Sequence, residues 1–135
     1  IIPTTTGAAI ATTKAHPELD GVFDGMAMRV PVPVGSIVDV TFIAKRDTTE
    51  QEINDAFRKA AADPRWKNIF AATDEPIVSS DIIGSRVGSI ADLSFTRVVG
   101  GNLVKVLAWY DNETSYTQTL VEHVAASAKH IANAK

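Results

Sequence analysis

The chain has 135 residues, 45% of them hydrophobic, and a formal charge of -3 at pH 7, which is typical of one globular domain of ordinary size. Its Lys and Arg residues are scattered rather than clustered, so charge predicts neither a nucleic-acid nor a membrane partner. No apolar run approaches the roughly 20 residues of a membrane-spanning helix, and residues 1–6 lack the basic region of a signal peptide, so we expect a cytoplasmic protein. The absence of cysteine excludes disulfides, thiolate metal sites and a cysteine nucleophile on this chain.

A short helix is predicted near the beginning of the chain. Residues 8–16 are rich in alanine and are followed by Pro17, a pattern that is typical of a helix and its end. Thr6 and Gly7 then stand where the unpaired amides of the helix begin.

Two strands are predicted next, joined by a turn. Residues 22–34 alternate large apolar side chains with small or charged ones, which is strand periodicity and places Arg29 apart from the apolar side chains. Residues 37–45 form a β-branched run that predicts a second strand. We expect the two strands to pair as a hairpin through the turn at Gly35.

The clearest helix in the middle of the chain begins at Thr49. Thr49 and Glu52 have the spacing of a capping box, and apolar residues recur at helical spacing as far as Ala61. After this helix, residues 66–78 are expected to cross the sheet, and the path beyond them is expected to be a loop.

The last third of the chain predicts a hairpin and a terminal helix. Residues 94–99 and 103–110 read as strands on either side of Gly100-Gly101-Asn102, which tolerates positive φ. The helix that follows carries an apolar stripe that must pack on another surface: Leu120, Val121, Val124, Ala125, Ala128, Ile131 and Ala132. The predicted fold class is α+β, with a mostly antiparallel mixed sheet, helices packed on one face and a C-terminal helix.

Two features near the beginning suit anion binding, although each has a commoner structural role. Thr6 and Gly7 cap a helix in the simpler interpretation, but helix-start amides and a hydroxyl also bind anions. Arg29 is a solvated strand residue in the simpler interpretation, but one arginine on a small or apolar strand face also suits a phosphate. Residue patterns alone favour the structural roles.

Other candidates are weaker still. Asn112 lies between a strand end and a helix start, where an amide either caps the helix or binds a carboxamide. The three histidines lack metal-ligand spacing and are expected on the surface, and Trp66 and Trp109 are expected in the core. No Gly-x-Gly-x-x-Gly follows a predicted strand, so no dinucleotide-binding fingerprint is present.

Several blocks, in the correct order, resemble phosphorylating glyceraldehyde-3-phosphate dehydrogenase. The blocks are Ile1-Ile2-Pro3-Thr4-Thr5-Thr6-Gly7-Ala8-Ala9, Leu19-Asp20-Gly21, Gly25-Met26-Ala27-Met28-Arg29-Val30-Pro31, Val38-Asp39-Val40-Thr41, Ile77-Val78-Ser79-Ser80-Asp81, Gly101-Asn102-Leu103-Val104-Lys105-Val106 and Trp109-Tyr110-Asp111-Asn112-Glu113. The resemblance extends from residue 1 to about residue 121.

The resemblance implies an enzyme that oxidises glyceraldehyde 3-phosphate with NAD and inorganic phosphate. It implies that Thr6 with Gly7 binds one phosphate group and that Arg29 binds the other. It also implies that Asn112 holds the nicotinamide carboxamide and that Tyr116 packs at the cofactor. The family often has Trp-Gly-Tyr where this chain has Thr114-Ser115-Tyr116, which leaves Asn112 and Tyr116 in register.

The same resemblance implies that this chain is incomplete as an enzyme. In the family, the nucleotide-binding domain, the nucleophilic cysteine and its histidine precede the block that begins here. We therefore expect residues 1–112 to be a portion of the catalytic domain, and residues 113–135 to be a helix that packs on the nucleotide-binding domain. The fragment is expected to be inactive alone and to belong to a homotetramer. The alternatives are a fragment of erythrose-4-phosphate dehydrogenase and a non-catalytic assembly or protein-binding module.

Overall fold

In the computed structural model, which describes residues 1–133, the chain forms two compact units, Ile1–Pro33 and Val34–Lys135. The first unit contains β1 (Ile2–Thr4), α1 (Ala8–Ala15), the short 3-10 helix η1 (Pro17–Leu19) and β2 (Ala27–Arg29). The second contains β3 (Ser36–Ile43), α2 (Glu50–Ala62), the short 3-10 helix η2 (Pro64–Trp66), β4 (Phe70–Thr73), β5 (Ser89–Val99), β6 (Leu103–Tyr110) and α3 (Thr114–Asn133). Residues 134 and 135, at the end of the predicted segment 113–135, lie outside the described residues.

The first unit contains a two-stranded antiparallel ribbon. β1 pairs with β2, so that Ile2 lies opposite Arg29. The strand predicted over residues 22–34 is thus confirmed only at β2, and the predicted hairpin with residues 37–45 is wrong. Pro31 and Pro33 explain the error, because proline has no N–H with which to continue a strand ladder toward β3.

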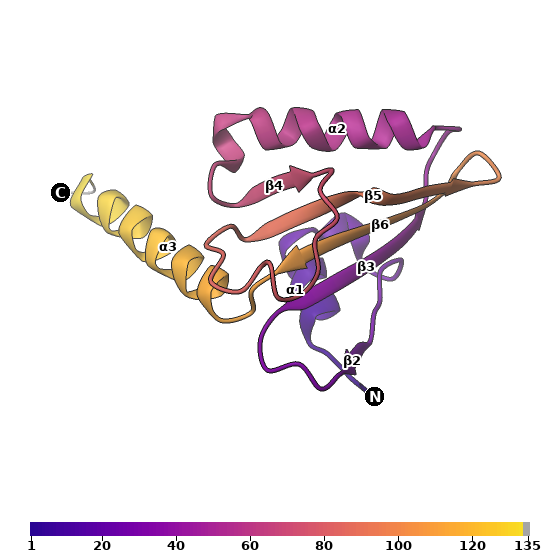
Figure 1. Ribbon diagram of the computed structural model, residues 1–135. Helices are drawn as coiled ribbons and strands as arrows, with labels where there is room; N and C mark the ends of the chain where they lie inside the picture. The colour runs from indigo at the N-terminus through magenta and orange to yellow at the C-terminus, as the bar shows by residue number, and fades with distance from the viewer. Residues whose placement is uncertain (134–135) are drawn as a thin grey trace. The chain divides into compact units, whose positions relative to one another are not determined.

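The second unit is built on a four-stranded sheet with the order β3-β6-β5-β4 (Figure 1). β3 and β5 are antiparallel to the central strand β6, and β4 is parallel to β5. The α+β class and the mostly antiparallel mixed sheet are therefore confirmed. The sequence missed β4 and the first five residues of β5, whereas β6 has the predicted bounds.

Helix α2 packs on the β4 and β5 side of the sheet (Figure 1). The rings of Phe57 and Phe70 lie 5.8 Å apart between centroids, and Val104 on β6 is fully buried. The hydroxyl of Thr49 accepts a hydrogen bond from the Glu52 N–H at 3.1 Å, which confirms one half of the predicted capping box. The carboxylate of Glu52 bonds to Arg46 and Thr48 instead.

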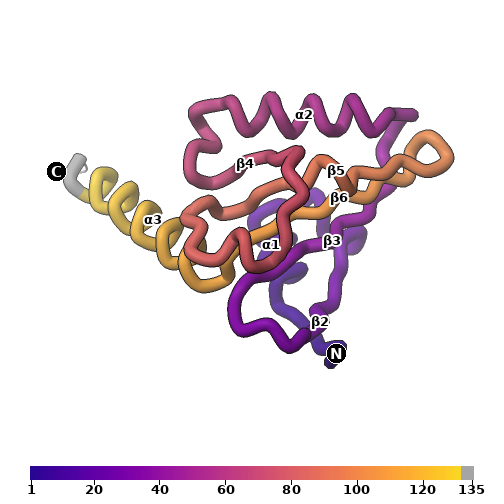
Figure 2. The backbone as a smooth tube through the Cα atoms, viewed as in Figure 1, coloured from indigo at the N-terminus to yellow at the C-terminus, as the bar shows by residue number. Residues whose placement is uncertain are grey.

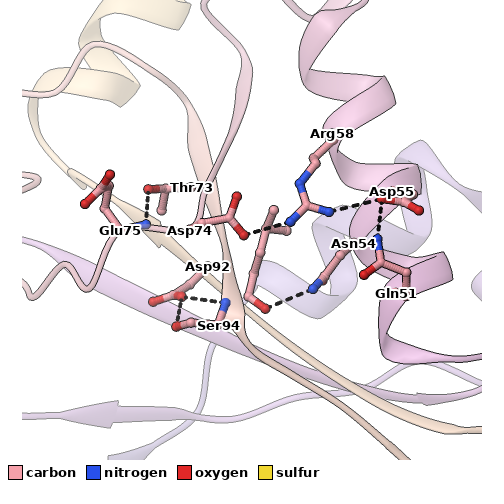
Figure 3. Close-up of polar contacts among 10 residues, drawn as sticks. Gln51, Asn54, Asp55, Arg58, Thr73, Asp74, Glu75, Asp92 and Ser94 are labelled. Carbon is pink, nitrogen blue, oxygen red and sulfur yellow. Dashed lines mark hydrogen bonds and ion pairs between the residues drawn. The ribbon is translucent and has the colours of Figure 1, made fainter.

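Polar contacts also join α2 to its neighbouring strands (Figure 3). The Asn54 Nδ2 donates to the Leu93 carbonyl of β5 at 3.1 Å, and the Arg58 guanidinium donates to Asp74 at 2.7 Å. At the irregular pairing of β5, the carboxylate of Asp92 accepts from the Ser94 hydroxyl at 2.6 Å. The bonds of Asn54 and Arg58 thus join α2 to β5 and to the residue that follows β4, whereas the Asp92–Ser94 bond lies within β5.

The tip of the β5–β6 hairpin lies beside the segment that leads into α2 (Figure 2). Gly100 and Gly101 have φ values of +60° and +87°, as the turn prediction requires. The Gly101 carbonyl accepts from the Thr48 N–H at 2.8 Å, so the turn is tied to the start of the helix.

The predicted positions of the tryptophans are half correct. Trp109 is partly buried, and its Nε1 donates to Asp92 at 3.0 Å. Trp66 is 42% exposed, which contradicts its predicted place in the core. It ends η2, which leads from α2 to the edge strand β4, and within residues 1–133 the sheet has no further strand beyond that edge.

Helix α3 follows β6 and extends away from the sheet (Figure 1). Apolar side chains along it are 48–69% exposed: Tyr116, Leu120, Val121, Val124 and Ile131. His123 and His130 lie exposed on this helix and His16 follows α1, as predicted for surface histidines. Among residues 1–133, no helix has the length and apolar character needed to cross a membrane.

Candidate functional site

Thr6 and Gly7 lie at the N-terminus of α1. Gly7 is the residue before the helix, and the Thr6 hydroxyl oxygen accepts from the Ala8 N–H at 3.1 Å. The other amides of the first turn have no partner within the helix. Apart from Gly7 and its two chain neighbours, no heavy atom of residues 1–133 lies within 4 Å of the position that a Cβ of Gly7 would occupy, so the space beside Gly7 is open. This geometry suits an anion, which the helix dipole attracts.

Arg29 ends β2 in the same unit. Its side chain is exposed, and no hydrogen bond or ion pair joins its guanidinium to another residue between positions 1 and 133. The register with Ile2 places it at the end of the β1–β2 ribbon away from Thr6. Arg29 therefore offers a free pair of N–H donors, which is the group that binds phosphate through two parallel hydrogen bonds.

Asn112 lies in the second unit, between the end of β6 and the start of α3. Its Oδ1 accepts from the Gly35 N–H at 2.9 Å. Within the described part of the chain, its Nδ2 has one long contact, of 3.4 Å, with Glu113. Because the oxygen is occupied, the exposed amide group presents a donor, which complements the oxygen of a carboxamide ligand.

Asp111, next to Asn112, is a buried carboxylate that accepts three backbone hydrogen bonds. Its Oδ1 accepts from the N–H groups of Glu113 and Thr114, both at 2.8 Å, and its Oδ2 accepts from Gly84 at 2.7 Å. The side chain thereby caps the turn that leads into α3 and joins it to the loop before β5. Bonds from Thr114 and Gly84 hold the pKa of Asp111 below its ordinary value.

This pKa shift predicts an acid-dependent stability. A depressed pKa in the folded state stabilises the fold above the unfolded pKa of about 3.9, and the contribution is lost as pH falls through the lower folded pKa. We expect Asp111→Asn to reduce the free energy of unfolding by about 1–2 kcal/mol at pH 7. Urea titrations at pH 7, 4 and 3 should show this difference between the two chains shrinking below pH 4. A difference that stays constant to pH 3 would contradict the assignment.

Tyr116 lies in the first turn of α3 and is 65% exposed. A shallow groove of about 420 Å³ runs along the same end of the helix. Its lining residues are Arg86, Glu113, Thr114, Thr117, Gln118 and Val121. Neither Tyr116 nor Asn112 lines this groove, so it is not the expected cofactor contact.

Sequence reasoning missed two glycines that donate to Asn112 and to its neighbour Asp111. Gly35 was predicted only as a turn, and Gly84 only as part of a loop, yet each donates to Asn112 or to Asp111. Both contacts join residues far apart in the sequence, so no local spacing could reveal them.

Comparison with known proteins identifies the family. Residues 1–112 match the family described as glyceraldehyde 3-phosphate dehydrogenase, C-terminal domain. The chain belongs to this family. The glyceraldehyde-3-phosphate dehydrogenase of Streptomyces coelicolor is 51% identical over 122 residues, which are 90% of this chain and 36% of that protein. Those of Borreliella burgdorferi and Geobacillus stearothermophilus are 50% and 49% identical, over 90% and 93% of this chain and 37% of each protein.

The family match confirms the resemblance to glyceraldehyde-3-phosphate dehydrogenase that the sequence blocks indicate. The matched range includes Thr6, Gly7, Arg29 and Asn112, whereas Tyr116 follows it. The chain spans a little over one third of the length of these glyceraldehyde-3-phosphate dehydrogenases, at 36–37%.

Proposed function

We propose that this chain is the C-terminal part of the catalytic domain of a phosphorylating glyceraldehyde-3-phosphate dehydrogenase. The reaction is the NAD-dependent oxidation of glyceraldehyde 3-phosphate with inorganic phosphate to 1,3-bisphosphoglycerate, a step of glycolysis. The observation that carries the proposal is the family match over residues 1–112, which includes the candidate groups for both phosphates and for the nicotinamide.

The first unit supplies the phosphate-binding groups. Thr6 and Gly7 bind one phosphate with the amides that begin α1, and Arg29 binds the other with its guanidinium. The open space beside Gly7 and the Arg29 guanidinium, which pairs with no residue between positions 1 and 133, support these roles. One group takes the phosphate of the aldehyde substrate and the other takes inorganic phosphate.

The second unit supplies a contact to the cofactor. Bound NAD would accept a hydride from the substrate. Asn112 orients the nicotinamide by donating from Nδ2 to the carboxamide oxygen, and the bond from Gly35 to its Oδ1 supports this orientation. Tyr116 packs beside the nicotinamide ring. Its exposed position in α3 supports this role.

The groups that break and form bonds come from the remainder of the enzyme. The covalent route needs a thiol nucleophile, and this chain contains no cysteine. The remainder also supplies the nucleotide-binding domain, on which the exposed apolar side chains between Tyr116 and Ile131 pack. The complete enzyme is a cytoplasmic homotetramer.

The substrate can be tested in a joined enzyme, in which residues 1–135 follow the preceding segment of a family relative. We expect NADH formation that requires inorganic phosphate and is at least about tenfold faster, as kcat/KM, with glyceraldehyde 3-phosphate than with erythrose 4-phosphate. A preference for erythrose 4-phosphate would favour the alternative dehydrogenase.

A non-catalytic assembly module is the second candidate, favoured by the exposed apolar side chains of α3. It predicts that a well-folded joined enzyme gains no phosphate-dependent turnover, and that the isolated chain does not bind inorganic phosphate.

A further inference from the structure

The side chain of Asn112 is held by a frame of hydrogen bonds that includes the buried carboxylate of Asp111. Asp111 is 1% exposed, although it immediately precedes the exposed Asn112. Its oxygens have different partners, since Oδ1 accepts from Glu113 and Thr114 and Oδ2 accepts from Gly84. Oδ1 thus bonds to the start of α3, which we call the helix arm, and Oδ2 bonds to the loop before β5, which we call the loop arm.

The helix arm of Asp111 fixes the backbone of Asn112. The bonds from the Glu113 and Thr114 N–H groups to Oδ1, both 2.8 Å, close a turn around Asn112. The Ser115 hydroxyl donates to the Asp111 carbonyl and closes the same turn from the other side. The Cα of Asn112 has little freedom to move relative to α3.

The loop arm fixes the partner of the Asn112 side chain. The loop that Asp111 ties at Gly84 also packs behind Gly35, because a Cβ on Gly35 would lie 3.1 Å from Ile82 Cδ1 and 3.2 Å from the Ser79 carbonyl oxygen. Ile82 itself is 2% exposed. The loop therefore holds the Gly35 N–H against Asn112 Oδ1, at 2.9 Å.

We infer that Asp111 is a positioning residue for the nicotinamide contact, acting through Asn112. This inference rests on the proposed function of Asn112. The carboxylate keeps Oδ1 of Asn112 on Gly35, so that Nδ2 is the atom presented to the ligand. Loss of the bond to Gly84 frees the Asn112 amide to rotate. The carboxamide oxygen of the ligand then faces the donor Nδ2 in one orientation and the acceptor Oδ1 in the other.

Asp111→Asn separates the two arms of the frame. Asparagine is as good an N-cap as aspartate, so its single carbonyl oxygen still accepts from the helix amides. Its Nδ2 then faces the Gly84 N–H, where two donors meet and no hydrogen bond forms. Asp111→Ser is the second variant, because serine caps the helix and is too short to reach Gly84.

The first measurement uses the full 135-residue chain and amide hydrogen exchange by NMR. We expect Asp111→Asn and Asp111→Ser to lower the protection of the Gly35 N–H by about tenfold, since one charge-assisted bond of its support is lost. Thr49→Ala is the matched control, because it removes the N-cap of α2 at a comparable cost in stability. Equal loss of Gly35 protection in Thr49→Ala and in the Asp111 variants would overturn the inference.

The second measurement is the dissociation constant of NAD for the joined enzyme, obtained by calorimetry. We expect about a tenfold increase for Asn112→Ala, about a fivefold increase for Asp111→Asn, and no increase beyond that of Asn112→Ala in the double variant. The KM for glyceraldehyde 3-phosphate should stay within twofold.

The outcomes separate the two proposals. An unchanged dissociation constant of NAD in Asn112→Ala refutes the proposed cofactor contact. The hydrogen-exchange data then still decide whether Asp111 positions Asn112. An increased dissociation constant of NAD in Asn112→Ala, combined with no effect or a fully additive effect of Asp111→Asn, refutes only the positioning role of Asp111.

Discussion

Replacing Arg29 with alanine in the joined enzyme should lower kcat/KM for glyceraldehyde 3-phosphate by about 100-fold or more. The guanidinium binds no other described residue, so its loss removes ligand contacts without removing a structural one. Two charge-assisted hydrogen bonds to a phosphate, at about 1.5–3 kcal/mol each, account for this factor. Initial rates of NADH formation measure it.

Two further variants make the Arg29 prediction specific. Arg29→Lys keeps the charge but not the planar pair of donors, so we expect about a tenfold loss. Arg65→Ala is the control, since Arg65 is exposed and pairs with Asp63 beside it. A decrease of less than twofold in Arg29→Ala would rule out phosphate binding by this side chain.

The second large effect is expected at Gly88, immediately before β5. A Cβ there would lie 2.8 Å from the carbonyl oxygen of Ile69. That oxygen also accepts from the Ser89 N–H at 2.9 Å, so relief of the clash breaks the start of the β4–β5 pairing. We expect Gly88→Ala to lower the free energy of unfolding by about 3 kcal/mol in urea titrations.

Gly25→Ala is the matched control for Gly88→Ala. Gly25 has no positive φ, and apart from its chain neighbours no described residue has a heavy atom within 4 Å of the position of its missing Cβ. We expect its change in unfolding free energy to stay within about 0.5 kcal/mol. A similarly small change in unfolding free energy for Gly88→Ala would contradict the prediction, because the backbone at the start of the β4–β5 pairing would then accommodate the added Cβ.

Elements with a strong local signal were predicted well. The capping residue Thr49 and the apolar spacing after it define α2, and two glycines define the β5–β6 turn. The mispredicted elements lack such a signal. Strand β4 contains two alanines, and the early part of β5 contains Asp92, a buried carboxylate that its hydrogen bonds stabilise. The pairing of β2 depends on β1, a strand of three residues that no periodicity marks.

The candidate site was predictable in part. Thr6, Arg29 and Asn112 were proposed from residue type, position and family resemblance. The hydrogen bonds that support Asn112 and Asp111 could not be predicted, because Gly35 and Gly84 are separated by 77 and 27 positions from the residues to which they donate. Hydrogen bonds of this range depend on the folded sheet, which brings the ends of β6 and the loops beside it together.

Under the proposed function, this chain carries ligand-binding groups of a dehydrogenase but lacks its nucleophile. The most direct test compares NADH formation from glyceraldehyde 3-phosphate, NAD and inorganic phosphate by the isolated chain and by the joined enzyme. We predict no turnover above background for the isolated chain and phosphate-dependent turnover for the joined enzyme. Turnover by the isolated chain, in a preparation shown by mass spectrometry to contain no intact dehydrogenase, would contradict the claim, as would a folded joined enzyme without activity.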